Sequence, residues 1–300
     1  MIGGFPKKNF YKKKKKTNNR ETICLNGRSS FSLILNYVKP NLIYIPFYIC
    51  NTILDILKSL NIKYKFYKID NRFKNKRFKL LENQWILKVP FFGIIKQKNE
   101  KNSIFDLSTS FFYDISSQGI YFNSLRKFFH VRFGSNINLP VRLNLKDASK
   151  DEIDRFKLPK NFKEFRTNEK KHFVLHRNVK KHINQSYFLN DFKKVKNERE
   201  INFKKLHRKF KKLNMLKFNL NEIRGPLYYP LLVKNGIIYK KKLNYNKIYN
   251  PNLWPEITKR KNSHKFQFEC NLAKNCIFLP VNEKISKKQF KKLYEILEIN

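Results

Sequence analysis

Residues 42–69, LIYIPFYICNTILDILKSLNIKYKFYKI, decide the fold of this chain. The apolar run 42–46 ends at a proline and predicts a short buried strand. Over residues 51–60 the apolar side chains recur at helical spacing, and residues 63–69 alternate as a second strand does. A strand, a helix and a strand at this spacing form one unit of a parallel sheet. The sequence therefore predicts an α/β fold.

Other segments extend this sheet. Residues 24–30 form a turn that opens a helix, and we expect Ser29 or Ser30 near its start. Further strands are expected at residues 85–92, 104–107 and 120–122. Because ligands of parallel sheets lie at the carboxyl ends of the strands, polar side chains that follow these strands are candidate site residues.

The second half of the chain changes character at about residue 146. Charged, helix-like sequence predicts helices at residues 151–156, 189–196 and 201–212. Alternation returns over residues 227–239, and residues 276–280 form a late strand before an amphipathic helix over 286–297. We therefore expect a basic arm (1–21), a large α/β domain (22–145), and a helical connection with a small C-terminal α/β domain (146–300).

The chain is strongly basic, with a formal net charge of +44 from 66 Lys and Arg against 22 Asp and Glu over 300 residues. One interpretation is a polyanionic partner, either nucleic acid or an anionic membrane. The other is AT-rich codon bias, because Lys, Asn, Ile, Phe and Tyr are all abundant, whereas alanine occurs only at Ala148 and Ala273. We favour bias, since the basic residues spread through the whole chain.

The spacing of the cysteines and the length of the apolar runs indicate the cellular compartment of the protein. The four cysteines lie far apart in the sequence, with no spacing that suits a metal site. No apolar run approaches the length of a membrane span. We therefore expect a cytoplasmic protein without a membrane span or a metal centre.

Two strand ends carry side chains that suit pyridoxal 5′-phosphate (PLP). Asp106 ends one apolar run, and Ser124 and Lys127 follow the next as Ser-Leu-Arg-Lys. A lysine amine can form a Schiff base with the cofactor aldehyde, and an aspartate can keep the ring nitrogen protonated, so that the ring accepts electrons. A serine hydroxyl can donate to the phosphate. Lys127 is therefore a candidate catalytic residue, and Asp106 and Ser124 are candidate cofactor ligands.

The order of several motifs resembles the DegT/DnrJ/EryC1/StrS family of sugar aminotransferases, from about residue 24 to the C-terminus. These motifs are Asn26-Gly27-Arg28-Ser29-Ser30-Phe31, Ile45 to Cys50 with Tyr67 to Asp70, Ile104-Phe105-Asp106, Asn123 to Phe129, Tyr249 to Pro255, and Asn275 to Val281. The resemblance implies the PLP-dependent transferase fold of type I, with a large, mostly parallel-sheet domain and a smaller C-terminal α/β domain.

The resemblance also assigns roles to residues. It implies that Lys127 binds the cofactor and moves protons as a general base, while Asp106 pairs with the ring nitrogen. The phosphate would be held by Ser124 together with the turn at Gly27, Arg28 and Ser29, whose backbone amides face it. Tyr48, or Cys50 two residues later, would lie where an aromatic side chain stacks on the ring.

The activity implied by the resemblance is transfer of an amino group from an amino acid, expected to be glutamate, to a nucleotide-linked keto-sugar. A homodimer working in polysaccharide biosynthesis goes with it. Departures from the family pattern occur at Thr109, where His or Gln is common, and at Phe133, where an Asp-Gly-Gly turn is usual. They leave the sugar open and admit a catalytically decayed copy as an alternative. A basic nucleic-acid-binding protein is the other alternative.

Overall fold

The computed structural model describes residues 22–75, 79–115, 119–154, 174–183, 187, 191–282 and 285–297. The described strands are β1 (Ile23–Cys24), β2 (Leu42–Pro46), β3 (Tyr64–Tyr67), β4 (Gln84–Lys88), β5 (Ser103–Leu107), β6 (Ile120–Asn123), β7 (Ser135–Asn138), β8 (Tyr228–Leu232) and β9 (Cys276–Pro280). The described helices are α1 (Gly27–Val38), α2 (Asn51–Ser59), α3 (Lys150–Asp154), α6 (Phe192–Phe210), α7 (Gly236–Tyr245), α8 (Gln267–Asn275) and α9 (Lys287–Ile296).

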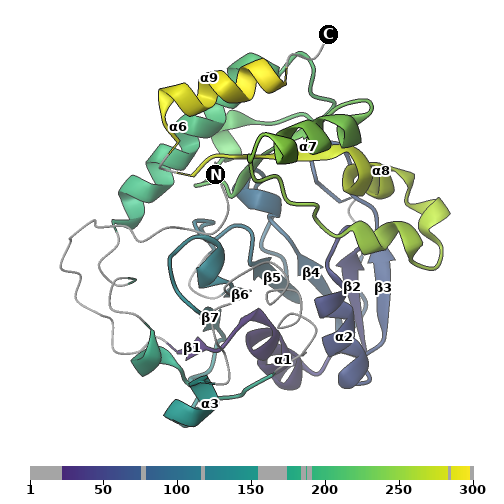
Figure 1. The fold of residues 1–300 in the computed structure, drawn as a ribbon. Helices are drawn as coiled ribbons and strands as arrows, with labels where there is room; N and C mark the ends of the chain where they lie inside the picture. The colour runs from purple at the N-terminus through teal and green to yellow at the C-terminus, as the bar shows by residue number, and fades with distance from the viewer. Residues whose placement is uncertain are drawn as a thin grey trace.

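The larger sheet has seven strands in the order β1-β7-β6-β5-β4-β2-β3 (Figure 1). Strands β6, β5, β4, β2 and β3 run parallel to one another. Strand β7 pairs antiparallel with both β6 and β1. The predicted α/β fold with a mostly parallel sheet is confirmed, and so is the unit β2–α2–β3. Because the five parallel strands share a direction, their carboxyl ends lie along one edge of the sheet.

Helices α1 and α2 cover one face of this sheet. Phe31 of α1 packs on Phe122 of β6 with ring centroids 5.2 Å apart. Helix α2 turns Ile53, Leu54, Ile56 and Leu57 into the core, as its sequence pattern predicts. Ser29 lies in the first turn of α1, as expected, but the cap is Asn26, whose side chain accepts from the Ser29 amide at 3.0 Å.

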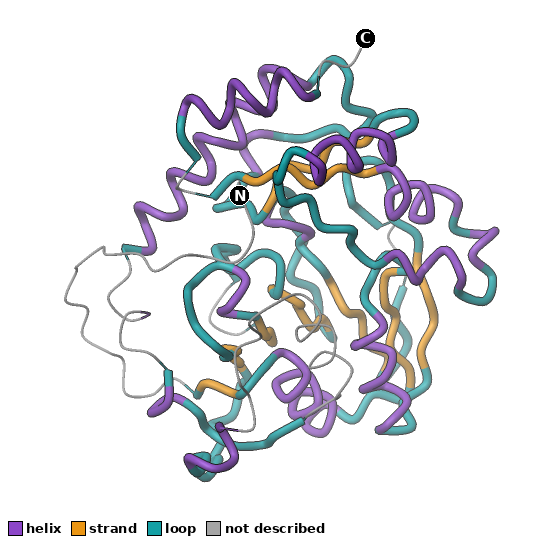
Figure 2. The backbone as a smooth tube through the Cα atoms, in the orientation of Figure 1, coloured by secondary structure: helices purple, strands orange, loops and turns teal. Residues whose placement is uncertain are grey.

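Irregular chain covers the opposite face, where a parallel sheet usually carries crossover helices. The described residues of the β3–β4 and β4–β5 connections form no helix apart from the short 3₁₀ turn η1 (Phe91–Gly93), and Figure 2 shows these connections as loop. Lys88, 3% exposed within β4, holds the second connection in place. Its Nζ donates to the Lys98 carbonyl at 2.7 Å and to Glu100 Oε2 at 2.8 Å.

A smaller two-stranded sheet forms the second layer of the molecule. Strands β8 and β9 pair antiparallel, and helices α6, α7, α8 and α9 surround them (Figure 1). The predicted strand at 276–280 and the helix after it are confirmed. Ser286 caps α9, and the Gln289 side chain accepts from its backbone in return. No described helix has the length and apolarity needed to cross a membrane.

Three local patterns differ from the structure. The strand expected over 85–92 ends at Lys88, because Pro90 lacks an N–H and the chain turns into η1. The alternation over 227–239 corresponds to a strand only as far as Leu232, and α7 begins after Asn235 reverses the chain with φ 54°. The helices expected at 189–196 and 201–212 are one helix, α6, in their described part.

Two predicted segments fall partly or wholly outside the described residues. The basic arm, residues 1–21, is one, and the end of the helix expected at 151–156 is the other, of which α3 is the described part. The described residues after 146 return to the large sheet: the Val179 amide donates to the Ile23 carbonyl of β1 at 2.8 Å.

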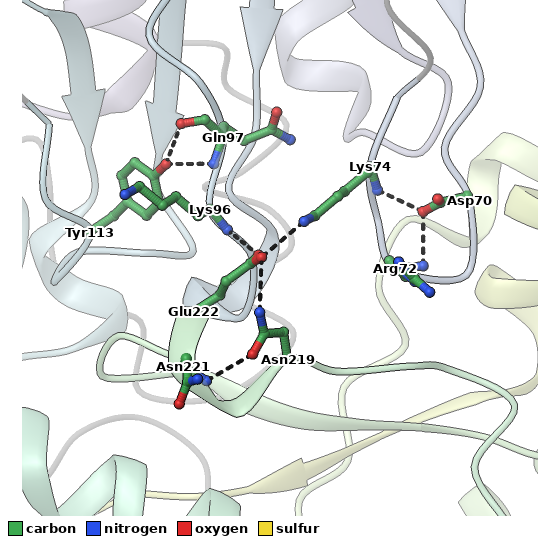
Figure 3. Close-up of polar contacts among 9 residues, drawn as sticks. All are labelled: Asp70, Arg72, Lys74, Lys96, Gln97, Tyr113, Asn219, Asn221 and Glu222. Atoms are coloured by element: carbon green, nitrogen blue, oxygen red, sulfur yellow. Dashed lines mark hydrogen bonds and ion pairs between the residues drawn. The ribbon is translucent and has the colours of Figure 1, made fainter.

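Glu222 joins the two layers (Figure 3). Its carboxylate accepts from Lys74 Nζ at 2.9 Å, from the Lys96 amide at 2.8 Å and from Asn219 Nδ2 at 3.3 Å. Lys96 belongs to the loop held by Lys88, and the Tyr113 hydroxyl fixes the next residue, Gln97, through both its amide and its carbonyl. Segments from three parts of the chain therefore meet at one carboxylate.

Removing Lys88 and removing its partner Glu100 should destabilise the protein to different extents. Lys88→Met keeps the side-chain volume and removes the charge, so we expect a loss of about 1 kcal/mol or less. Glu100→Ala leaves the cation buried with a carbonyl as its acceptor, so we expect a larger loss of about 2–3 kcal/mol. Urea unfolding of both variants measures the difference, and equal losses would contradict this role for Lys88.

Glu222 predicts acid sensitivity at the junction. Burial raises the pKa of Glu222, but the hydrogen bonds from Lys96, Lys74 and Asn219 lower it below the usual 4.5. A lowered pKa means that the stabilisation is present above pH 4.5 and is lost as the pH falls through the pKa of the folded state. We expect Glu222→Gln to lower the free energy of unfolding by about 1–2 kcal/mol at pH 7. The difference from wild type should disappear in acid, and a constant difference across this pH range would contradict the assignment.

Candidate active site

Asp106 lies at the carboxyl end of β5, on the face that α1 covers. It pairs in register with Phe122 of β6, the residue on which α1 packs. The carboxyl group is 8% exposed, and its Oδ1 accepts from the Ser108 amide at 2.8 Å. The parallel order of the sheet thus places an acidic side chain in the position where ligands of such sheets bind.

The surroundings of Asp106 disfavour its charge. Burial raises the pKa of the carboxyl group, and the Ser108 hydrogen bond and the positive charge of Lys127 only partly offset this. A carboxylate in this position gains stability from a further cation placed against it. The protonated nitrogen of a pyridine ring is such a cation.

Lys127 approaches Asp106 from the end of the neighbouring strand. It lies in the 3₁₀ turn η2 (Leu125–Lys127), directly after β6, and is exposed in the single chain. The turn is fixed by Leu125, whose amide donates to the Gly134 carbonyl at 2.9 Å, and by the buried rings of Phe128 and Phe129. The charge of Lys127 acts on both Asp106 and Cys50. Asp106, near the end of β5, and Lys127, after β6, therefore lie at the same edge of the sheet.

Cys50, rather than Tyr48, lies beside this pair. Burial raises the pKa of the Cys50 thiol, the Asp106 carboxylate raises it further, and Lys127 lowers it. Tyr48 is fully buried, with its ring 4.6 Å from that of Trp254 and 5.9 Å from that of Phe91. Its role at the cofactor stays a prediction, and Cys50 is the residue of the two that the structure brings to Asp106 and Lys127.

The N-terminus of α1 meets the ends of β5 and β6. A Cβ added at Gly27 would lie 3.5 Å from the Asn123 carbonyl oxygen and 3.5 Å from Ser108 Oγ. Asn26 accepts from the Ser29 amide, and the first N–H groups of any helix have no acceptor within the helix itself. This end of a helix suits an anion.

The hydroxyl groups of Ser29 and Ser124 differ in their hydrogen bonding. The Ser29 hydroxyl donates to Asn26 Oδ1 at 3.2 Å and accepts from the Leu175 amide at 3.0 Å, so it organises the turn. Ser124 is half-buried at the start of η2, and its side chain makes no capping hydrogen bond. Of these two hydroxyls, that of Ser124 is better placed for a ligand.

Sequence reasoning missed Ser108. Its amide hydrogen-bonds Asp106 two residues earlier, which is the turn that an Asp-x-Ser sequence favours. The Asp-x-Ser spacing in the sequence could have predicted this hydrogen bond. Thr109, noted as a departure from the family pattern, is 5% exposed and accepts from the Phe92 amide at 3.3 Å, so it supports η1. No group of three or more His, Cys, Asp or Glu suited to a metal ion occurs among the described residues.

Comparisons with known proteins agree with this geometry at the level of the fold. No protein-family model and no curated protein matches the sequence. The structure is similar to a DegT DnrJ EryC1 StrS aminotransferase from Brucella abortus (TM-score 0.65, 11% identity, covering 92% of this chain and 84% of that one). It is also similar to a sugar aminotransferase from Micromonospora echinospora (TM-score 0.63, 11% identity, 93% and 87% covered).

A third similar structure is the GDP-4-keto-6-deoxy-D-mannose-3-dehydratase of E. coli with bound hydrated PLP (TM-score 0.66, 12% identity, 93% and 87% covered). At such low identity these likenesses establish the fold alone. The chain therefore shares the fold of these sugar aminotransferases and of the PLP-bound dehydratase, and the predicted fold class is confirmed.

The burial of Asp106 predicts a gain in stability when its charge is removed. A carboxyl group whose pKa is raised by folding destabilises the fold above its ordinary pKa of 3.8. We expect Asp106→Asn to unfold about 2 °C higher than wild type at pH 7, a difference of the order of 1 kcal/mol. The gain should shrink as the pH falls towards 3.8. Calorimetry without cofactor tests this, with Asp55→Asn on α2 as the control, and a loss of stability at pH 7 would contradict it.

Proposed function

We propose that this protein is a PLP-dependent aminotransferase that moves an amino group from an amino acid, glutamate, to a nucleotide-linked keto-sugar. The observation that supports the proposal is that Asp106 and Lys127 lie at the carboxyl ends of adjacent parallel strands, with the charge of Lys127 acting on Asp106. The fold that holds them is the one found in sugar aminotransferases.

The residues present fit the cofactor. Asp106 is a buried carboxylate that a ring cation would stabilise. The start of α1 at Gly27 lies against Ser108 and Asn123, so the helix N-terminus and the Ser124 hydroxyl offer donors for a phosphate group. Lys127 supplies the amine. Ser29 contributes by holding the turn, and Tyr48, two residues before Cys50, by packing its ring against Trp254 and Phe91.

These groups divide the chemistry among themselves. PLP, when bound, supplies an electron sink that stabilises negative charge on the carbon that bears the amine. Asp106 holds the positive charge at the ring nitrogen. Lys127 anchors the cofactor and, once its amine is free, takes a proton from one carbon and returns it to another as a general base. The phosphate donors at α1 keep the ring in register with Lys127.

We further propose a cytoplasmic homodimer. Lys127 is exposed in the single chain, whereas proton transfer by an amine is favoured where water is excluded. A second subunit placed over this edge of the sheet would provide that cover. The excess of basic residues would favour a substrate that carries a diphosphate.

The proposal is tested by the visible spectrum of the purified protein with PLP, followed by borohydride reduction and mapping of the labelled peptide. We expect a yellow protein with the label on Lys127. Lys127→Ala should lose both the absorption band and the label, and Lys101→Ala, an exposed lysine before β5, should keep both. A colourless wild type, or a label elsewhere, would sink the proposal and favour a decayed copy or a nucleic-acid-binding protein.

Product analysis then separates amino transfer from removal of water, the reaction named for the similar E. coli dehydratase. With glutamate and a nucleotide-linked keto-sugar, amino transfer yields an aminated sugar and one 2-oxoglutarate for each turnover. A deoxygenated sugar without a bound amine would assign the dehydratase reaction instead.

A further inference from the structure

Helix α7 exposes apolar side chains to solvent and buries a lysine. Ile237 and Ile238 are 52% and 51% exposed, and Tyr245 is 89% exposed. Lys240, in contrast, is 7% exposed and faces the protein. Exposed isoleucines scattered singly are normal, but here two adjacent isoleucines and a tyrosine share one helix of ten residues.

The inner side of α7 is fixed in place. A Cβ at Gly236 would lie 1.9 Å from the Asn275 carbonyl oxygen, so the helix starts in direct contact with the end of α8. Lys240 Nζ donates to the Lys274 carbonyl at 3.0 Å and to the Ala273 carbonyl at 3.2 Å, and Leu243 is fully buried. The helix therefore cannot roll to hide its isoleucines without breaking these contacts.

Positive charge surrounds the exposed apolar residues. The sequence from residue 223 to residue 255 contains no Asp or Glu. Helix α9 packs beside α7, and within its bounds the acidic residue is Glu295 (Figure 1). The exposed lysines on and around the two helices are Lys234, Lys241, Lys242, Lys247, Lys287, Lys288, Lys291 and Lys292.

Codon bias explains part of this surface. It accounts for many lysines and isoleucines in the chain, but it does not determine that a lysine is buried in α7 while two isoleucines face outward. Exposing the isoleucines and desolvating an ammonium both cost free energy. A partner that is apolar within and anionic at its surface offsets the first cost and attracts the surrounding lysines. Nucleic acid matches the lysines but offers little to isoleucine.

We propose that the outer face of α7 (Ile237, Ile238, Lys241, Lys242 and Tyr245), together with the lysines of α9, docks on an anionic lipid bilayer. The isoleucines and Tyr245 enter the boundary between headgroups and acyl chains, and the lysines lie against the lipid phosphates. The interaction is peripheral and reversible. It does not depend on the catalytic assignment, because α7 contributes no residue to the site around Asp106.

Sedimentation of the full-length chain with lipid vesicles tests the proposal. We expect the protein to pellet with vesicles of phosphatidylcholine and phosphatidylglycerol, and to stay in solution with phosphatidylcholine alone. The double variant Ile237→Ser, Ile238→Ser should partition about tenfold or more weakly. A second variant, Lys241→Glu, should weaken binding about fivefold or more at low salt.

The matched control is Leu81→Ser with Val141→Ser, which removes two exposed apolar side chains from the large-sheet layer. It should bind as wild type does, and thermal unfolding should show all variants folded. Wild-type binding by the double isoleucine variant would overturn the proposal. So would binding of single-stranded DNA in preference to anionic vesicles, with no effect of the isoleucines, since that assigns the surface to nucleic acid.

Discussion

A buried ammonium group within the large sheet supports the rest of the architecture. The described parts of the crossovers that follow β3 and β4 form no α-helix, so irregular chain covers one face of the sheet. Lys88 makes this possible by binding the Lys98 carbonyl and Glu100 from inside β4. The loop held in this way presents the Lys96 amide to Glu222, and Glu222 attaches the smaller sheet. Lys88 therefore links the position of this loop to the junction between the two layers.

The face of the sheet that α1 covers carries the candidate site. Parallel strands bring Asp106 and Lys127 together from consecutive strand ends, and the short first strand brings the start of α1 to the same place. Asp106 lies there at a cost to stability, because burial disfavours its charge. A fold under selection for stability alone would place a neutral side chain at this position. Because a cation against Asp106 would offset this cost, the position fits the proposed cofactor.

The sequence was sufficient where a rule links spacing to position. Strand ends in a parallel sheet share an edge, so the sequence alone predicts that Asp106 and Lys127 lie at the same edge, whereas their roles stay predictions. The choice between Tyr48 and Cys50 depends on which side chain the aromatic cluster of Phe91 and Trp254 captures, and that is a matter of packing. The engagement of the Ser29 amide by Asn26 is likewise a local competition between caps that periodicity does not resolve.

Packing, rather than sequence pattern, also decides the structure of helix α7. The sequence pattern around it did not predict a helix. Asn235 adopts a left-handed conformation, Gly236 fits against Asn275, and the helix starts at this point. Once the helix is fixed by Gly236, Lys240 and Leu243, geometry alone decides that the isoleucines face outward. Composition sets which residues are abundant, whereas packing sets where each one points. A position at which the two disagree, such as the buried Lys240 beside exposed isoleucines, therefore carries more functional information than the net charge of the whole chain.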